Sequence, residues 1–165
     1  MKKEYESLID TTTLEDNQKL VVKTTWLEYL KSCDKNAWNG WWNHHIFSIL
    51  IIILGVLIPI LENSSLRIQL LGKEFGIAGL LGLIIAIAAG ITAHWKFESR
   101  WKHYRLQAEI MRAEGEGFFA LSNKYSKYQN HKEALKDFIG IVTLFKRKEV
   151  EVYIKTKDDD SDSKK

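Results

Sequence analysis

The chain has 165 residues, with 24 Lys and Arg against 21 Asp and Glu, so its formal net charge is +3 at pH 7. This charge is too small and too dispersed to predict a nucleic-acid-binding surface. The single cysteine, Cys33, cannot form an internal disulfide and fits a reducing compartment. Residues 1–30 carry charges throughout and contain no apolar segment of the kind that a cleavable signal peptide needs.

The first pattern along the chain is an amphipathic helix that leads into an apolar segment. Its apolar face is spaced in steps of three and four residues and consists of Val22, Trp26, Tyr29, Cys33 and Ala37. This spacing places the five side chains on one side of a helix. We expect that side to pack against other helices.

Two apolar segments follow, at about residues 44–61 and 75–95. The first reaches full length when His44 and His45 are included, and the second contains no Asp, Glu, Lys or Arg. With a rise of about 1.5 Å per residue, each forms a helix long enough for the ~30 Å hydrocarbon core of a bilayer. The sequence therefore predicts a transmembrane hairpin, and the alternative is a buried helical hairpin in a soluble core.

Charge and tryptophan predict the orientation of this hairpin. The connecting loop has only Arg67 and Lys73, whereas more basic residues flank the other ends of the two segments. The positive-inside rule then predicts a multi-pass membrane protein with both termini in the cytoplasm and the short loop outside. Five tryptophans gather on the cytoplasmic side as predicted interfacial anchors: Trp38, Trp41, Trp42, Trp95 and Trp101.

The second apolar segment carries a row of small residues. Ala78, Gly82, Ala86 and Gly90 recur at every fourth position and form a groove of nearly bare backbone. Such a groove lets helices approach closely in lipid, where no hydrophobic force drives them together. It either receives the first apolar helix of the same chain or forms an interface between subunits of a homo-oligomer.

Beyond the second segment the pattern stays helical. A seam from Trp101 to Tyr125 alternates in steps of three and four, and a final helix carries Phe138 and Val142 on its apolar face. Nothing after Trp95 predicts that the helix stops there. The predicted fold is an all-α membrane protein in which long amphipathic cytoplasmic helices form a bundle. Only the segment 150–154 has an alternation compatible with a strand.

The predicted domain organisation is simple. Residues 14–154 form a single two-transmembrane domain, preceded by a flexible N-terminus over residues 1–13. Residues 155–165 are rich in Asp, Ser and Lys and are expected to be a disordered acidic tail, because they have too few apolar residues to form a core.

No catalytic constellation is visible, so we expect no enzyme, no cofactor and no catalytic residue. His94 and Glu98 are four residues apart, but no second pair has metal-ligand spacing, so no metal site is expected either. Polar residues at the ends of the apolar segments are candidates for the mouth of a pore. They are Glu62, Asn63, Ser64, Thr92, His94 and Glu98.

The order of these features resembles a known family. The residues that carry the resemblance are Trp26-Leu-Glu-Tyr-Leu30, Asp34-Lys-Asn-Ala37, Asn39, Leu57-Ile-Pro-Ile-Leu61, Trp101-Lys-His-Tyr-Arg105, Ala108-Glu109, Glu114, Phe118, Tyr125, Glu149 and Tyr153. The chain is similar, over roughly residues 20–153, to the SLATT group of small bacterial proteins with two transmembrane helices. It is closest to the branch catalogued as a domain of unknown function. Tyr153 stands where the pattern usually has tryptophan.

The resemblance implies a protein of the bacterial inner (plasma) membrane that is an oligomeric channel or pore-forming effector, of the kind that accompanies nucleotide-signalling conflict systems. The motif residues Trp101, Tyr104, Arg105 and Glu109 then flank the membrane, and Arg105 and Glu109 tie cytoplasmic helices together. We expect a homo-oligomeric ion channel whose partners are membrane lipid, further copies of the chain and permeating ions, and not nucleic acid. The alternatives are a non-conducting membrane adaptor whose helical bundle binds a protein partner and, less supported, a membrane enzyme.

Overall fold

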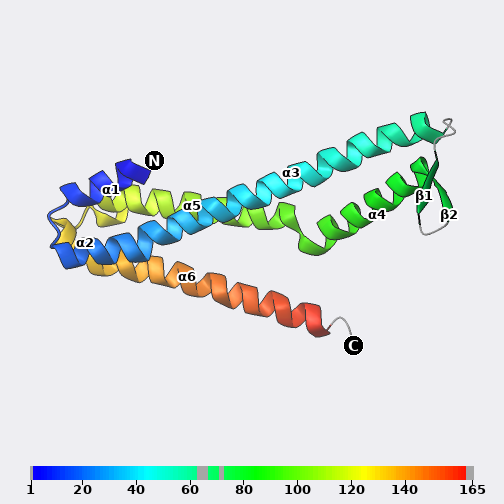
Figure 1. Cartoon of the computed structure of the whole chain (residues 1–165). Helices are drawn as coiled ribbons and strands as arrows, with labels where there is room; N and C mark the ends of the chain where they lie inside the picture. Colours follow the sequence, from blue (N-terminus) through cyan, green and yellow to red (C-terminus); the bar gives the residue numbers. More distant parts are fainter. Residues whose placement is uncertain (1, 63–66, 71–72, 163–165) are drawn as a thin grey trace. The chain divides into compact units, whose positions relative to one another are not determined.

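The computed structural model describes residues 2–62, 67–70 and 73–162, and most of them are helical (Figure 1). The elements in chain order are α1 (Lys2–Thr11), α2 (Asp16–Val22), the π-helix η1 (Lys23–Leu27), α3 (Glu28–Glu62), β1 (Arg67–Leu70), β2 (Lys73–Gly76), α4 (Ile77–Trp95), α5 (Phe97–Phe119), the 3-10 helix η2 (Asn123–Tyr125) and α6 (His131–Asp162). The predicted helical fold is confirmed.

A short β-hairpin joins α3 to α4, where the sequence predicted a plain loop. Strands β1 and β2 are antiparallel, with Arg67 opposite Gly76 and Leu70 opposite Lys73. Each strand has only four residues, too few for an alternating pattern to stand out in a sequence. The segment 150–154, which has a strand-like alternation, is part of helix α6.

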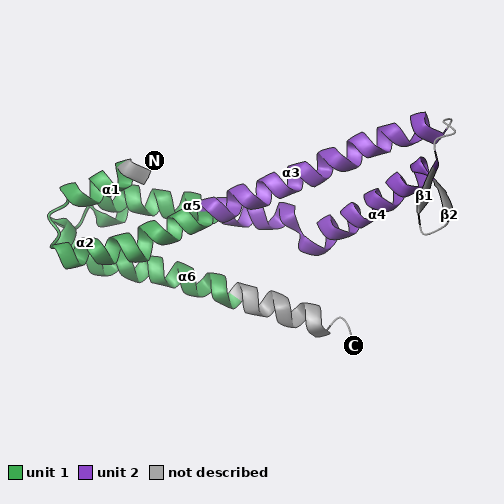
Figure 2. Cartoon of the chain, in the orientation of Figure 1, with its two compact units in different colours: residues 1–33, 106–165 green, residues 34–105 purple. Residues whose placement is uncertain are grey.

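The chain divides into two compact units (Figure 2). Unit 1 consists of residues 1–33 and 106–165, and unit 2 consists of residues 34–105. The long helices α3 and α5 each contribute residues to both units. The sequence predicted one domain over residues 14–154, and the two units subdivide that range.

Unit 1 is a helical bundle around an aromatic core. Its largest fully buried side chains are Trp26, Tyr125, Phe118, Phe138, Ile9, Leu27, Met111, Val22, Val142 and Cys33. The rings of Phe118 and Phe138 stack with their centroids 4.2 Å apart. Most of these residues, such as Trp26, Phe118 and Phe138, come from apolar faces that the helical spacing predicted, whereas Ile9 of α1 and Leu27 of η1 belong to no predicted face.

Trp26 lies at the centre of this core, within the π-helix η1. Its indole N–H donates to the carbonyl oxygen of Met111 at 2.8 Å, so the one polar atom of the ring is satisfied. Gly115 lies directly against the ring, and a Cβ at this position would be only 2.2 Å from Cζ2 of Trp26. A glycine is therefore required where α5 passes the indole.

Three tyrosines in unit 1 donate hydrogen bonds to carboxylates. Tyr29 binds Glu149, Tyr125 binds Glu114, and Tyr128 binds Asp137. The Tyr125–Glu114 pair is buried, and Lys124 also donates to Glu114 at 2.6 Å. Because a buried carboxylate is costly without partners, these two donors are what allow Glu114 to lie inside the bundle.

The two ends of the chain are more ordered than the sequence predicted. Residues 2–11 form helix α1, in which Ile9 is completely buried and Tyr5 meets the Trp26 ring edge-on at 5.3 Å. This anchoring replaces the flexible segment expected over residues 1–13. At the other end, α6 continues to Asp162, into the range where a disordered tail was expected.

Unit 2 contains the end of α3, the β-hairpin, α4 and the start of α5 (Figure 2). Helix α3 continues through Pro59 to Glu62 without a break. Helix α4, by contrast, ends at Trp95, and Lys96 separates it from α5 with a left-handed backbone, φ 46° and ψ 43°. The break corrects the expectation that the helix continues past Trp95.

Candidate functional site

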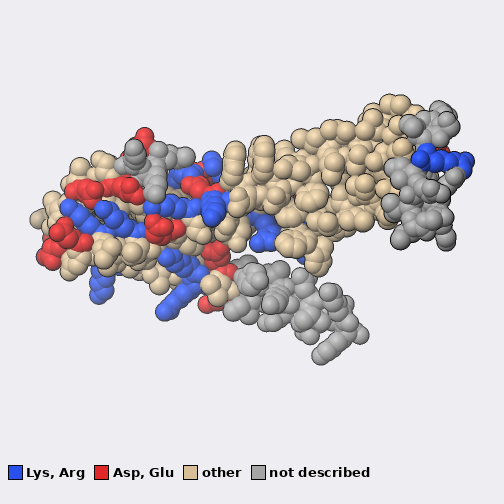
Figure 3. Space-filling view, viewed as in Figure 1, with Lys and Arg blue, Asp and Glu red and all other residues tan. Residues whose placement is uncertain are grey.

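The most unusual surface of the molecule is the apolar part of α3 and α4. Large aliphatic side chains are more than half exposed along both helices: Ile49, Ile52, Ile53, Val56, Ile60, Leu83 and Ile87. The most apolar 18-residue windows of the two helices are 0% and 6% buried. Figure 3 shows that this face of α3 and α4 lacks Lys, Arg, Asp and Glu, which instead cover the elements of unit 1.

Both helices are long and apolar enough to span a membrane. A helical hairpin in the core of a soluble protein also has apolar helices, but it buries them against the rest of the protein. Here almost no residue of either apolar window is buried, and the others are half-buried or exposed. Exposed apolar surface of this extent indicates a contact with lipid or with another protein.

The row of small residues lies on a face of α4 that the other described residues leave at least partly open. Ala88 is the buried residue of this helix, with 4% exposure, whereas Ala86 and Gly90 are exposed. Positions two apart on a helix point in nearly opposite directions, about 200° around the axis. A Cβ built on Gly82 or Gly90 meets no atom within 4 Å.

This geometry bears on the two interpretations of the row. Ala78 and Gly82 are half-buried, and the other two members of the row are exposed, so the exposure of the row increases toward the end of α4. Among the described residues, nothing fills the space over its glycines. Packing against the first apolar helix of the same chain therefore leaves the groove unused, and its role as an interface between subunits stays a prediction.

The predicted mouth residues fall into separate groups. Glu62 is exposed at the end of α3, and Asn63 and Ser64 lie outside the described residues. At the other end of the hairpin, Thr92 donates its hydroxyl to the carbonyl of Ala89 at 2.9 Å, and His94 is exposed.

Glu98 has its own partner at that end. It accepts a hydrogen bond from Lys102 at 2.6 Å, and this bond lowers the pKa of the Glu98 carboxyl, with a smaller contribution from the nearby His44. The Glu98 carboxylate is thus part of an exposed ion pair with Lys102, one turn along α5.

The tryptophans form a stacked ladder on α3. The ring centroids of Trp38 and Trp41 are 5.4 Å apart, those of Trp41 and Trp42 are 5.6 Å apart, and the ring planes are within 23° of parallel. Trp38 is 63% exposed and Trp42 is 51% exposed. Exposed indoles beside an apolar helix are typical of residues that lie at a membrane–water interface.

Sequence reasoning missed a second aromatic cluster at the break between α4 and α5. Phe97 stacks on Phe47 with centroids 5.9 Å apart and planes 9° apart, and it also stacks on Trp95 at 6.0 Å. The spacing gave no signal for this contact, because Phe47 and Phe97 are fifty positions apart in the sequence.

Trp101 has a role beyond that of an anchor. A Cβ on Gly40 would lie 2.9 Å from the Cβ of Trp101, so α3 and α5 approach each other closely at this point. The indole N–H of Trp101 is buried and makes no hydrogen bond within the described part of the chain. Of the other motif residues, Tyr104 is half-buried, and Glu109 accepts a hydrogen bond from Arg112 at 2.7 Å.

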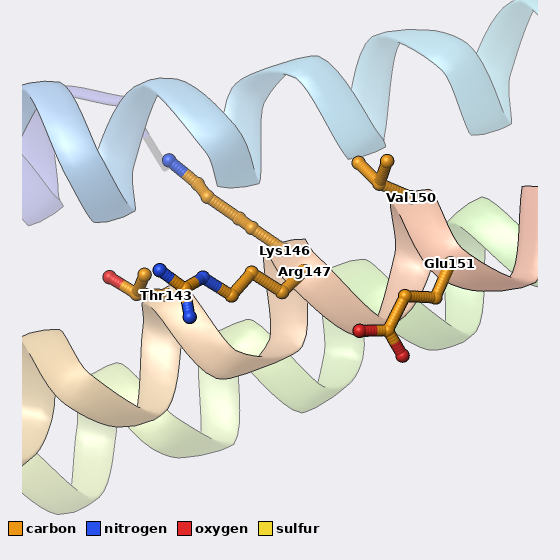
Figure 4. Close-up of a pocket in the computed structure, with 5 residues that line it drawn as sticks. All are labelled: Thr143, Lys146, Arg147, Val150 and Glu151. Carbon is orange, nitrogen blue, oxygen red and sulfur yellow. The ribbon is translucent and has the colours of Figure 1, made fainter.

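Two surface cavities lie in unit 1. One of about 370 Å³ is lined by the α6 residues Thr143, Lys146, Arg147, Val150 and Glu151 (Figure 4). The Nζ of Lys146 lies 5.0 Å from the centre of the Tyr29 ring, and burial lowers the pKa of this lysine. The other cavity, of about 360 Å³, includes Glu114 and Tyr125.

Several polar groups that line these cavities already have partners within unit 1. Glu114 is bound by Tyr125 and Lys124, and Lys146 lies on the Tyr29 ring. In the part of the chain that the structure describes, no group of three or more His, Cys, Asp or Glu side chains is placed to hold a metal ion. The arrangement in unit 1 therefore points to a structural bundle, with the unusual surface in unit 2.

A comparison with protein families gives one match, which covers most of these features. Residues 34–133 match the family described as a protein of unknown function, DUF4231. The chain belongs to the DUF4231 family. The region that the family shares includes both apolar helices, the β-hairpin, the Lys96 break and the whole of α5. No curated protein and no solved structure matches the chain.

The limits of the DUF4231 match are informative. It begins where unit 2 begins, at residue 34, and it ends near the start of α6. The common region thus contains all of unit 2 but only part of unit 1. What the family shares is centred on the apolar hairpin and on the helix that follows it.

Proposed function

We propose that this protein is a homo-oligomeric membrane protein whose apolar helices α3 and α4 span a lipid bilayer and form an ion-conducting pore. The observation that carries the proposal is the exposure of both apolar helices together with the open small-residue groove on α4. Lipid covers aliphatic side chains without cost, and small residues allow close contact between helices of neighbouring subunits.

The proposal includes a location and an orientation. The protein lies in the bacterial inner membrane with both termini in the cytoplasm, supported by the exposed tryptophans Trp38 and Trp42 at one end of α3. In cells that carry Cys33→Ala, an impermeant thiol reagent should label a cysteine at Glu62 but not one at Ser126. Labelling of Ser126→Cys alone would reverse the orientation.

The finer assignment to the SLATT group is part of the same proposal. The SLATT-like order of motifs, with Trp101-Lys-His-Tyr-Arg105 directly after the second apolar helix, supports an effector that acts on the membrane of its own cell. No residue of this motif is expected to do chemistry, and we propose that the protein is not an enzyme. Its partners are then lipid, ions and further copies of the chain.

The decisive experiment measures ion flux. Purified protein in liposomes should conduct ions, and Glu62→Lys or Glu98→Lys should change the reversal potential, because charges at a pore mouth set the local ion concentration. The control is Glu116→Lys, which reverses an exposed charge in unit 1. The effect should shrink at high salt, since exposed charges are screened.

The second candidate is a membrane adaptor that does not conduct. The α6 cavity favours it, because this cavity is lined by the exposed charged residues Arg147 and Glu151 on a helix outside the hairpin. Folded, correctly oriented protein that gives no flux above protein-free liposomes at either voltage polarity would refute the pore and leave the adaptor.

A further inference from the structure

The backbone groups of Lys96, where α4 ends and α5 begins, are both hydrogen-bonded. The amide of Lys96 donates to the carbonyl of Thr92 at 3.2 Å and so closes the last turn of α4. The carbonyl of Lys96 accepts the amide of Arg100 at 3.1 Å and so opens the first turn of α5. One residue thus separates two helices, and both of its backbone groups are bonded.

The residue at this joint is an unusual choice for its conformation. Lys96 has φ 46° in the left-handed region, where glycine is the common residue at the end of a helix. Any side chain with a Cβ pays a steric penalty there. The local backbone preference of Lys96 therefore favours the right-handed conformation, in which α4 and α5 form one continuous helix.

The sequence around the joint permits that continuous helix. No glycine or proline occurs between Ile91 and Arg112, so nothing local requires a break. In the bent form the Phe97 ring stacks on Phe47 and on Trp95, and this packing favours the bend. Backbone preference and ring packing thus favour opposite conformations of a single residue.

We infer that Lys96 is a two-state hinge between the apolar helix α4 and the helix α5. The left-handed state is the bent form with the Phe97 stack closed, and the right-handed state is the straight form with the stack open. Helix α3 has no break at this level and keeps its shape. The inference rests on the proposed function in one respect: the hinge changes the position of α4, and with it the opening of the pore.

The test uses two substitutions that both remove the lysine charge. Asparagine tolerates the left-handed region, whereas β-branched valine does not. Compared with Lys96→Asn, Lys96→Val should lower the ratio of bent to straight molecules about five- to thirtyfold, the factor that follows from the left-handed penalty. Each is made with and without Phe97→Ala, which removes the ring that holds the bent form.

Spin labels report the conformation in lipid nanodiscs. The labelled positions are Leu83 on α4 and Lys102 on α5, both exposed, in a Cys33→Ala chain. A continuous helix separates their Cα atoms by about 28 Å, and a bent one brings them closer. A control pair at Ile46 and Ile60 on the uninterrupted helix α3 should keep its separation in every variant.

The possible results distinguish a failure of the hinge proposal from a failure of the pore proposal. We expect Lys96→Val with Phe97→Ala to populate the long distance more than Lys96→Asn with Phe97→Ala does, and ion flux to differ between the two. Identical distance distributions overturn the hinge, even if the wild-type protein conducts. A shift in distance with equal flux in a conducting protein overturns its role in opening. A shift in a protein that never conducts supports the hinge and refutes the pore.

Discussion

Gly115→Ala gives the sharpest test of how unit 1 is held together. The added Cβ would lie 2.2 Å, 2.7 Å and 2.9 Å from three carbons of the Trp26 indole, distances at which the ring or the helix has to move. Trp26 is completely buried and bound to the carbonyl of Met111. The rings of Tyr5 and Phe119 also pack against it, so the indole cannot swing aside without losing contacts.

The magnitude follows from three effects. Overpacking a core costs about 1–3 kcal/mol. Loss of the Trp26 hydrogen bond leaves a buried N–H unsatisfied, which costs about 1–3 kcal/mol. Alanine recovers about 1 kcal/mol of helix propensity over glycine. We therefore expect Gly115→Ala to lower the free energy of unfolding by about 3 kcal/mol, or to lower Tm by roughly 6–12 °C for a chain of this size.

The matched control is Gly117→Ala in the same helix. Gly117 is also buried, but its added Cβ would meet Tyr125 at 3.7 Å, an ordinary contact distance. This variant should be as stable as the wild type or slightly more stable. Thermal unfolding by circular dichroism, in one detergent for all variants, measures the difference.

A double-mutant cycle with Trp26→Leu isolates the contact. Leucine removes the ring atoms that the new methyl group meets, so Gly115→Ala should cost much less in that background. Equal stability of Gly115→Ala and Gly117→Ala, or an unchanged cost of Gly115→Ala in the Trp26→Leu background, would refute the assignment of this glycine to close packing against the indole.

Three further predictions concern the groove and the carboxylates. Gly82→Leu should dissociate the oligomer in detergent, because leucine fills the groove, whereas Gly55→Leu on the equally open face of α3 should not; equal sizes by light scattering would refute the interface. Tyr125→Phe should cost about 1–3 kcal/mol by leaving a buried carboxylate with one donor fewer, and Tyr128→Phe, whose partner is exposed, should cost less in thermal unfolding. Hydrogen bonds from Tyr128 and Lys127 lower the pKa of Asp137 below its usual 3.8, so its contribution to stability is present above about pH 4 and is lost as the pH falls further. Asp137→Asn should make the acid decline of Tm shallower, and an unchanged decline would contradict this.

The features that the sequence predicted correctly are those that depend on local pattern. Two apolar segments of sufficient length and the helical spacing of Trp26, Phe118 and Phe138 needed no knowledge of distant contacts. The small-residue row was visible for the same reason. Its open orientation was not, because the side of α4 that faces α3 depends on how two helices pack.

The features that were missed depend on contacts between distant residues. No glycine or proline near Lys96 indicates a break in the helix, and the Phe47–Phe97 stack joins residues that are fifty positions apart in the sequence. Helix α1 lies where a flexible segment was expected, and burial of Ile9 in unit 1 anchors it. In each case packing decides a conformation that local preference leaves open or opposes.

The two units differ in how much of their apolar surface they bury within the chain. This difference is the strongest argument that unit 2 carries the function. Unit 1 closes its core within one chain, with Trp26 and Phe138 fully buried. In unit 2 the buried apolar side chains among the described residues are only the small ones of Ala37 and Ala88. A hairpin that buries so little gains little stability from its own packing, since the stabilising free energy scales with the apolar area removed from water.

The stability of unit 2 therefore depends on what surrounds it. A bilayer removes the aliphatic side chains of α3 and α4 from water, but lipid tails fill a narrow backbone groove less well than a second helix does. The groove at Gly82 and Gly90 is open, and a neighbouring copy of the chain offers a helix of matching length. Under the proposed function, a subunit in the membrane thus retains this groove on α4, which only a helix of another subunit covers closely. The apolar segment that inserts into the bilayer then also contains the surface that drives assembly.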